Sequence, residues 1–254
     1  MSTRIVQMSD THLFEDPDGI LLETRTRTGT EAVINHIREN AGPFERLVIS
    51  GDLVHEEGEQ AYQELRMLLG DWAQISLVIP GNHDNRSSLK AAFAENSGSL
   101  AEAAVFNDNI GGWQLIGLDT LKAGAVEGEI EETQWDWLEG LLRSSHASMA
   151  IFMHHPAFMI GSAWLDQLGL LEPEKFERLI SGTPQVKLIS AGHVHQECSG
   201  TIAHAAAYTL PAASVQFAAG TTEFAVGDES PGYRIFDLEE DGSFTTEVVR
   251  VPVS

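Results

Sequence analysis

Five apolar, β-branched runs recur along this chain, and a short polar motif begins where each run ends. The runs are Arg4–Met8, Leu47–Ser50, Ile75–Pro80, Ala150–Met153 and Val186–Ala191. The motifs are Asp10-Thr11-His12, Gly51-Asp52, Gly81-Asn82-His83-Asp84, His154-His155 and Gly192-His193-Val194-His195. Near-continuous apolar runs of this length are typical of strands that are buried on both faces. The chain is therefore expected to build a covered, largely parallel sheet.

Helical patterns alternate with these runs, which strengthens that expectation. They span Thr30–Asn40, Glu59–Trp72, Glu131–Leu142 and Pro173–Ile180. The early part of the chain thus alternates strand and helix, which is the signature of crossover units in an α/β fold. Ligands of such sheets gather at the carboxyl ends of the strands. Because every motif falls at such an end, the sequence predicts that the five motifs share one site.

The last quarter of the chain has a different pattern. Short strand-like runs, joined by Gly, Asp and Pro turns, cover Tyr208–Leu210, Ser214–Ala218, Gly232–Asp237 and Phe244–Val251. We expect antiparallel strands from about residue 200 onward, added to a second sheet. No linker or repeat interrupts the sequence, so residues 1–254 are predicted to form a single domain.

Charge and composition exclude several classes of partner. The 38 acidic and 15 basic residues give a net charge of −23, and bulk nucleic acid needs many more basic side chains than that. An acidic chain can still bind a small anion where divalent ions supply positive charge locally. No apolar run reaches the roughly 18 residues that span a membrane. One cysteine and the absence of a signal-like N-terminal segment favour the cytoplasm.

The residue types in the motifs suit a pair of divalent metal ions. Asp10 and His12 are two residues apart, so both side chains point the same way on extended chain. The same holds for His193 and His195. A carboxylate such as that of Asp52 can bridge two metals through its two oxygens. Each motif alone has an ordinary explanation, a loop cap or a turn, but all five in order at strand ends predict a dinuclear centre.

The remaining motif residues divide into candidate ligands and candidate catalytic groups. Asn82 offers a neutral carbonyl oxygen to a metal, and His83 beside it can donate a proton to a leaving oxygen or stabilise transition-state charge. Asp84 is expected to orient that catalytic group rather than to bind metal. Adjacent residues on a strand face opposite sides, so only one of His154 and His155 should be a ligand, and the residues alone do not choose between them.

With these motifs the sequence resembles the calcineurin-like metallophosphoesterases from residue 10 to residue 195. The resemblance implies a four-layer α-β-β-α sandwich with two mixed sheets. It also implies that Asp10, His12, Asp52 and His195 hold one metal, and that Asp52, Asn82, His154 and His193 hold the other. It selects His154 as the ligand of the histidine pair. Manganese or iron are the metals the family favours, while the nitrogen and oxygen ligands also accept zinc, cobalt or nickel.

A closer resemblance is to the bacterial class III cyclic-nucleotide phosphodiesterases. It rests on residues 7–13, on His154-His155-Pro156 followed by residues 161–166, and on residues 214–217 and 230–234. It implies hydrolysis of 3′,5′-cyclic AMP to 5′-AMP by a metal-bridging hydroxide. A glycerophosphodiester or a broad range of diesters is the alternative, and a non-catalytic scaffold of the same fold is a third reading that the complete ligand set disfavours.

Substrate contacts are expected at the centre and in the loop that follows it. Asn82, His83 and His195 are predicted to contact the phosphodiester. The loop 156–171 carries Trp164, whose ring can stack on a nucleobase or merely pack the loop onto its neighbours. The expected partners are thus a small phosphodiester and a second copy of the chain in a homodimer. No membrane partner is expected.

Overall fold

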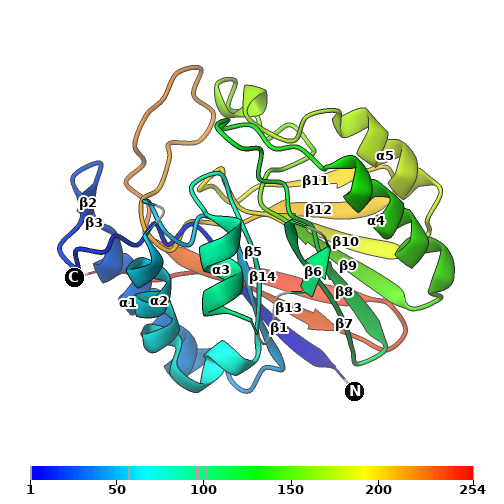
Figure 1. The fold of residues 1–254 in the computed structure, drawn as a ribbon, viewed down its shortest axis with the longest axis horizontal. Helices are drawn as coiled ribbons and strands as arrows, with labels where there is room; N and C mark the ends of the chain where they lie inside the picture. Colours follow the sequence, from blue (N-terminus) through cyan, green and yellow to red (C-terminus); the bar gives the residue numbers. More distant parts are fainter. Residues whose placement is uncertain (1, 57, 95–97, 101, 254) are drawn as a thin grey trace.

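Two mixed β-sheets lie face to face at the centre of the molecule (Figure 1). The computed structural model describes residues 2–56, 58–94, 98–100 and 102–253. The first sheet has the strand order β14-β13-β1-β4-β5. Its strands are β1 (Thr3–Met8), β4 (Arg46–Ser50), β5 (Ser76–Ile79), β13 (Gly232–Leu238) and β14 (Phe244–Arg250). The strands β1, β4 and β5 are parallel, whereas β13 and β14 add antiparallel at the β1 edge.

The second sheet has the order β11-β12-β10-β9-β8-β7-β6. Its strands are β6 (Gly98–Leu100), β7 (Ala103–Ile110), β8 (Trp113–Gly117), β9 (Ser148–Met153), β10 (Val186–Ala191), β11 (Ser199–Ile202) and β12 (Ala205–Thr209). The strands β8, β9, β10 and β12 are parallel, and the outer pairs are antiparallel. A two-stranded ribbon of β2 (Ile20–Leu21) and β3 (Thr24–Arg25) precedes the first helix.

Helices cover the outer face of each sheet. The first sheet carries α1 (Thr26–Asn40), α2 (Glu59–Leu69) and α3 (Arg86–Ala92), and the second carries α4 (Glu132–Ser144) and α5 (Pro173–Ser181). Two short 3₁₀ turns, η1 (Gly70–Gln74) and η2 (Leu165–Gln167), complete the elements. Apolar residues at helical spacing, such as Val33 and Ile37 of α1, pack against Val6 and Met8 of β1.

A separate apolar cluster fills the space between the two sheets. Ile5 of β1 and Val48 of β4 contribute from one sheet, and Ala150 and Phe152 of β9 contribute from the other. Because side chains alternate along a strand, the neighbour Val6 lies in the helix-facing cluster instead. Both faces of these strands are therefore buried, which explains their near-continuous apolar sequence. The predicted four-layer sandwich is confirmed.

The five predicted runs and the four predicted helices are present, with small differences in their bounds. The helix predicted to reach Trp72 ends at Leu69, because Gly70 turns the backbone to a φ of 59°, and a 3₁₀ turn follows. The sequence patterns did not identify the edge strands β6 and β11, the inner strands β7 and β8, or the helix α3.

The C-terminal prediction needs two corrections. The segment Ser214–Ala218 is a loop rather than a strand, with only an isolated bridge from Phe217 to Val226. Its polar groups bond to other parts of the chain, as the next subsection describes. The strands β13 and β14 join the first sheet, so only β11 and β12 extend the second, and β12 runs parallel to β10.

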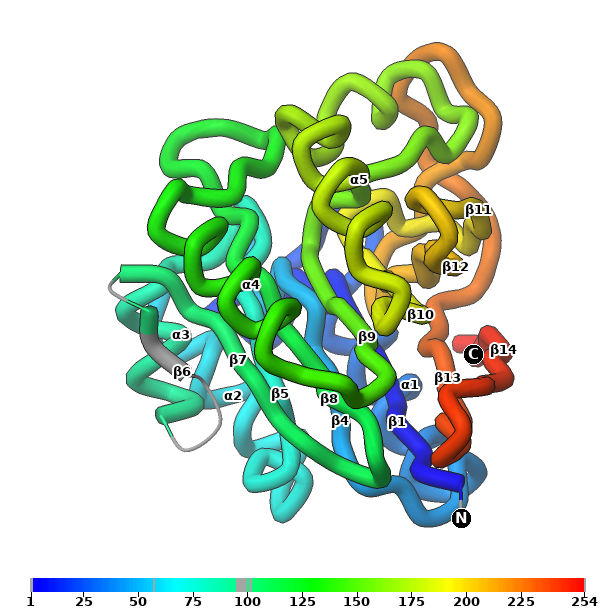
Figure 2. The backbone as a smooth tube through the Cα atoms, turned by 90° about the vertical axis from the view of Figure 1, so that its right-hand side faces the viewer, coloured from blue at the N-terminus to red at the C-terminus, as the bar shows by residue number. Residues whose placement is uncertain are grey.

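The parallel strands of both sheets end at the same end of the molecule. In Figure 2 the loops that follow β8, β9 and β12 rise together at the top, while the N-terminus lies at the bottom. The loops after β1, β4 and β5 meet those after β9 and β10 within hydrogen-bond distances there. The fold thus brings the five motifs together from both sheets.

Candidate metal centre

Seven predicted ligands converge in the loops that follow five strands. We call these segments the ligand loops; they are residues 9–13, 51–55, 80–85, 154–155 and 192–196. The predicted ligands are Asp10 and His12 after β1, Asp52 after β4, Asn82 after β5, His154 after β9, and His193 and His195 after β10. Six of them are buried and Asn82 is half-buried. The fold therefore places every predicted ligand at one buried point between the two sheets.

The Asp52 carboxylate lies between ligands of the two sheets. Its Oδ2 atom is 3.5 Å from His12 Nε2 and 3.4 Å from His154 Nε2. On the other side of His12, the Nε2 atom of His195 lies 3.3 Å from His12 Nε2 and 3.2 Å from Asp10 Oδ1. One oxygen of Asp52 is thus central to both predicted ligand groups, which is the position that a bridging carboxylate needs.

Three buried polar atoms of the centre have no hydrogen-bond partner within the described residues. They are Asn82 Oδ1, His154 Nε2 and His193 Nε2. An unsatisfied buried polar atom costs about 1–3 kcal/mol. All three are metal-binding atom types, and a cation placed among them removes that cost. The donor set therefore fits divalent metal, with nitrogen and oxygen ligands only.

Hydrogen bonds to main-chain carbonyls fix the tautomers of two ligand rings. His154 Nδ1 lies 2.8 Å from the Ser50 carbonyl oxygen, and His195 Nδ1 lies 2.6 Å from that of Val215. A carbonyl can only accept, so the proton must be on each Nδ1. In the neutral form of each ring the lone pair is therefore on Nε2, and such partners are typical of metal-ligating histidines.

The backbone of the ligand loops is strained where the ligands lie. Five ligands have a left-handed backbone, with φ of 57° at Asp10, 45° at His12, 50° at Asp52, 70° at His193 and 51° at His195. That conformation costs a non-glycine residue about 1–2 kcal/mol. Such strain persists only where surrounding contacts enforce it, and it is concentrated at functional sites. The strain is thus a second, independent sign of a site.

Glycines in three motifs are required by close approach. A Cβ atom on Gly51 would collide with the His154 ring, and one on Gly81 would collide with the Asp52 carboxylate. A Cβ atom on Gly192 would collide with the Ser9 hydroxyl. The Gly-Asp, Gly-Asn-His-Asp and Gly-His-x-His spacings therefore follow from how tightly the ligand loops pack against each other.

The charge states of His12 and His193 suit metal binding at neutral pH. Burial lowers the pKa of His12 and of His193 to about 3, so both rings are neutral and have a lone pair to offer. Burial alone would raise the pKa of Asp10, but the neighbouring His195 ring outweighs it and the pKa falls to about 2. The pKa of Asp52 is held well below its usual range, because His154 likewise outweighs burial. Burial lowers the pKa of His154, but the charges of Asp52 and Asp10 outweigh it and raise that pKa to about 9, so this ring must lose a proton when a cation binds.

His155 is excluded as a ligand by its hydrogen bonds. Its Nε2 lies 2.9 Å from the Val126 carbonyl oxygen and therefore donates, and its Nδ1 accepts from the Thr120 hydroxyl at 2.8 Å. Both nitrogens are used, and burial lowers the pKa of the ring well below its usual range. Of the two adjacent histidines, only His154 has a nitrogen free for the centre, a choice that the residues alone left open.

Asp84 supports the loops from within the protein. Its carboxylate accepts hydrogen bonds from the main-chain N–H groups of Gly81 (2.8 Å) and Leu53 (3.2 Å) and from the Tyr62 hydroxyl (2.9 Å). Burial, followed by the Asp52 charge, raises its pKa to about 7. These contacts fit the expected orienting role, because Gly81 and Leu53 lie next to predicted ligands in the ligand loops.

His83 lies beside the ligands with one face of its ring covered. Its main-chain N–H donates to Asp52 Oδ1 at 2.9 Å, and its ring Nδ1 lies 3.1 Å from the His55 carbonyl oxygen. The sequence patterns did not identify His55, because a single histidine three residues after Asp52 has no distinguishing pattern.

Trp164 packs within two loops beside the centre. These are residues 156–171 and 217–230, which we call the outer loops. The indole N–H of Trp164 donates to the Thr221 hydroxyl at 3.1 Å, and its ring lies edge-on to Phe217 and Phe224. Phe217 stacks flat on the His195 ring, with 4.1 Å between the centroids. Trp164 thus joins the outer loops to each other, which favours the packing role over direct stacking on a base.

The segment mispredicted as a strand supports the centre from outside. The Ser214 hydroxyl donates to the Asp10 carbonyl oxygen at 2.6 Å, and Val215 provides the carbonyl that holds His195. The Ala213 N–H donates to the Ser9 carbonyl oxygen at 2.9 Å. The first two residues of the segment are thus committed to the ligand loops, while Gln216 and Ala218 bond to Gly227 and Ala225.

Comparison with known proteins agrees with the geometry. The chain is 31% identical over 251 residues to the 3′,5′-cyclic adenosine monophosphate phosphodiesterase CpdA of Vibrio vulnificus, covering 98% of this chain and 90% of that protein. It is 30% identical to the CpdA of Escherichia coli K12 over the same shares of the two chains. A 3′,5′-cyclic-nucleotide phosphodiesterase of Nostoc is 30% identical, with 98% and 93% covered.

Solved structures share the fold at low identity. A dimetal phosphatase from Danio rerio superposes with a TM-score of 0.69 at 15% identity, covering 98% of this chain and 99% of that one. A purple acid phosphatase from yellow lupin superposes with a TM-score of 0.64 at 14% identity, covering 98% of this chain and 52% of that one. Both comparisons support the four-layer architecture.

The sequence profile of the calcineurin-like phosphoesterases matches residues 3–197, which include every motif described above. Membership implies divalent metal ions, in agreement with the side chains gathered at the strand ends. The prediction of an enzyme, a metal-dependent phosphoric ester hydrolase whose relatives have phosphodiesterase names, is confirmed. By its profile, its relatives and its fold, this chain belongs to the calcineurin-like phosphoesterase family.

Proposed function

We propose that this enzyme hydrolyses 3′,5′-cyclic AMP to 5′-AMP with two divalent metal ions. The relatives named for this reaction align with 98% of the chain, which supports the substrate. The observation that carries the proposal is the set of three orphaned buried atoms around the Asp52 carboxylate. These atoms support metal binding, and the relatives' names support the reaction.

The ligands divide into two sets that share Asp52. We propose that Asp10, His12, Asp52 and His195 hold one ion and that Asp52, Asn82, His154 and His193 hold the other. Manganese or iron is proposed from the family resemblance, and the thiolate-free donor set also accepts zinc, cobalt or nickel. When bound, two such ions activate a water molecule as the nucleophile and neutralise charge on the phosphoryl oxygens.

The protein's own contribution centres on His83. With Nδ1–H directed to the His55 carbonyl, the opposite nitrogen Nε2 is left to face substrate. A proton at Nε2 can be donated to the 3′ oxygen as the P–O3′ bond breaks, or can stabilise charge on the phosphoryl group. Asn82 and His195 are proposed to contact the phosphodiester, and Asp84 keeps the loop of His83 in place. His83→Ala with near-normal turnover would contradict the catalytic role.

The deciding experiment compares substrates under one condition. Manganese-loaded protein is assayed on 3′,5′-cyclic AMP, glycerophosphocholine and a simple phosphomonoester. A clear preference for cyclic AMP, measured as kcat/KM, is the expected result. Faster cleavage of glycerophosphocholine would discard the substrate but keep the diester reaction. Absence of turnover on all three, with metal content verified, would contradict the function.

Assembly and location remain predictions. A homodimer is expected, and sedimentation of the metal-loaded protein would measure it. The cytoplasm is the expected compartment, to be checked by cell fractionation. Among the residues the structure describes, none of the helices has the length and apolar character needed to cross a bilayer.

A further inference from the structure

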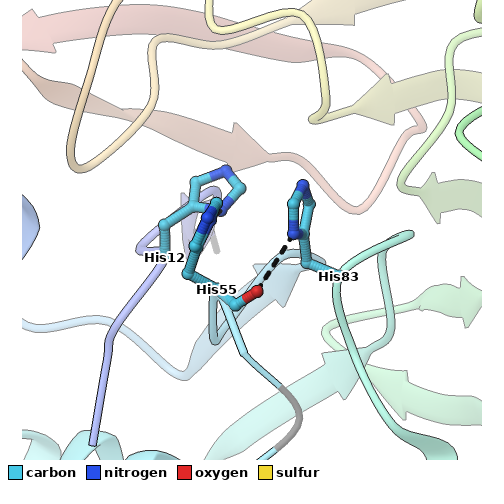
Figure 3. Close-up of side chains that lie close together, drawn as sticks. All are labelled: His12, His55 and His83. Atoms are coloured by element: carbon cyan, nitrogen blue, oxygen red, sulfur yellow. Dashed lines mark hydrogen bonds between the residues drawn. The ribbon is translucent and has the colours of Figure 1, made fainter. Parts of the chain in front are cut away.

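His55 contacts two aromatic rings beside the candidate centre. Its ring stacks on that of His83, with 4.7 Å between the centroids and 24° between the planes. The Phe14 ring also lies 4.7 Å away, at 41°. Figure 3 shows the rings of His55 and His83 next to each other, with His12 beside them, and the bond from His83 to the His55 main-chain oxygen.

The backbone of His55 is itself fixed. Its N–H donates to the Leu13 carbonyl oxygen at 2.9 Å, and Val54 beside it forms a bridge with Leu13. The loop after β4 is thus tied to the loop after β1. Because the residue is held at its main chain and by Phe14, its ring and its carbonyl form a rigid support for a neighbouring side chain.

We propose that His55 is a positioning residue that holds the His83 imidazole in its reactive orientation. The carbonyl oxygen of His55 fixes rotation of the His83 ring by accepting its Nδ1–H, and the His55 ring covers one face of it. The His12 ring lies edge-on to the His83 ring as well, with 4.9 Å between the centroids. This inference rests on the proposed function, in which the Nε2 atom of His83 acts on the substrate.

A third metal site formed by His12, His55 and His83 is the competing reading. Their ring nitrogens lie within 4.8 Å of one another. However, His83 Nδ1 is committed to a carbonyl oxygen. With His12 Nε2 bound to metal, as proposed above, the proton of that ring is on Nδ1, and His55 Nδ1, 3.5 Å away, accepts it. The three Nδ1 atoms are then all used.

The test is a double-mutant cycle on cyclic AMP turnover. We expect His55→Ala to lower kcat roughly 3- to 10-fold, the range that a ring stack supplies, with KM within about twofold. Both variants keep the main-chain carbonyl, but His55→Phe also keeps a stacking ring, so it should recover most of kcat. In a His83→Ala background, His55→Ala should have no further effect, because the group it positions is gone.

Controls separate positioning from stability. His146→Ala removes an exposed histidine in the turn before β9, at the opposite end of the strand, and should leave kcat unchanged. Urea unfolding of each variant verifies folding, and metal content verifies that the ligands are intact. Unchanged kcat in His55→Ala, or an equal loss with and without His83, would overturn the inference. So would a third ion per chain that is lost in His55→Ala.

A second measurement does not depend on turnover. Relaxation of the ¹³Cε1–H group of His83 reports how rigidly the ring is held, in wild type, His55→Ala and His55→Phe. We expect a rigid ring in wild type and His55→Phe and a mobile ring in His55→Ala. A rigid ring in all three would overturn the inference. If wild type has no phosphodiesterase activity, the proposed function fails, and this measurement still decides whether His55 holds His83.

Discussion

The ligand loops and the outer loops lie at the same end of the molecule but are held in different ways. In the ligand loops, buried hydrogen bonds and strained backbone fix each side chain, as at Asp52 and His195. The outer loops combine aromatic contacts around Trp164 with hydrogen bonds such as Ala163 N–H to the Thr221 carbonyl, and Phe224 among them is 51% exposed. The difference teaches that, of these two regions, strained non-glycine backbone is reserved for the ligands, and we expect changes in the outer loops to affect the chemistry less.

The largest effect is expected at the carboxylate of Asp52, which the two ligand groups share. Asp52→Asn keeps the shape of the side chain but removes its charge from between the two ligand groups. We expect kcat/KM to fall by more than about 100-fold, since even the outer partners of metal ligands are worth 10- to 100-fold. Activity assays with parallel metal analysis measure the effect. Asp71→Asn, at an exposed aspartate, is the control.

Glycine substitutions compare the two kinds of loop directly. Gly51→Ala forces a Cβ atom into the His154 ring at a φ of 94°, and should lower the free energy of unfolding by about 2–5 kcal/mol, combining overpacking with backbone strain. Gly220→Ala in an outer loop has a φ of 71° but open space, so only about 1–2 kcal/mol is expected. Urea denaturation of both proteins gives the two values. Equal losses would mean that the loops are alike in rigidity.

Metal binding should raise the free energy of unfolding, and this gain should depend on His154 but not on His155. Manganese at 100 times its dissociation constant should raise the free energy of unfolding of wild type by about 2.7 kcal/mol. His154→Ala should lose most of that gain. His155→Ala should keep it but start from a less stable protein, because two buried hydrogen bonds are gone. Thermal unfolding with and without manganese measures both, and a His155→Ala protein that fails to respond would reverse the assignment.

The smallest effect on activity is expected from changes in the outer loops. Trp164→Ala removes the ring that joins the two outer loops, and should raise KM about 3- to 10-fold with kcat nearly unchanged. Trp164→Phe keeps an aromatic ring but loses the bond to Thr221, so its KM should lie in between. Steady-state kinetics on cyclic AMP decide. A loss confined to kcat would show that the outer loops take part in the chemistry.

Sequence patterns could predict most of the strands that are buried on both sides. They missed β8, which is fully buried, because Gln114 and Gly117 interrupt its apolar run. The run Val186–Ala191 is apolar because helices cover one face and the other sheet covers the other, and such a run needs no context to be recognised. Edge strands such as β11, with three exposed residues out of four, lack that pattern. Ser214–Ala218 has the composition of a strand, yet its polar groups are used by Asp10 and His195, which only the folded chain can reveal.

In the candidate site, too, local sequence patterns were predictable and contacts between distant residues were not. Ligand types and spacings were predictable because metal chemistry restricts them to Asp, Asn and His at fixed offsets from a strand end. The residues alone could not decide between His154 and His155, because that choice depends on where Thr120 and Val126 lie. His55 was equally hidden, because its role depends on rings that Phe14 and His83 bring to it from other loops.

The centre draws its side chains from both sheets, with Asp10 near the start of the chain and His195 close to residue 200. During synthesis on the ribosome, the first sheet's ligands emerge long before the last two histidines. A nascent chain therefore has carboxylates and imidazoles ready for a cation well before it can close a complete coordination sphere. We expect catalytic competence to arise in one late step, and partial chains to be inert toward the substrate whatever their metal supply.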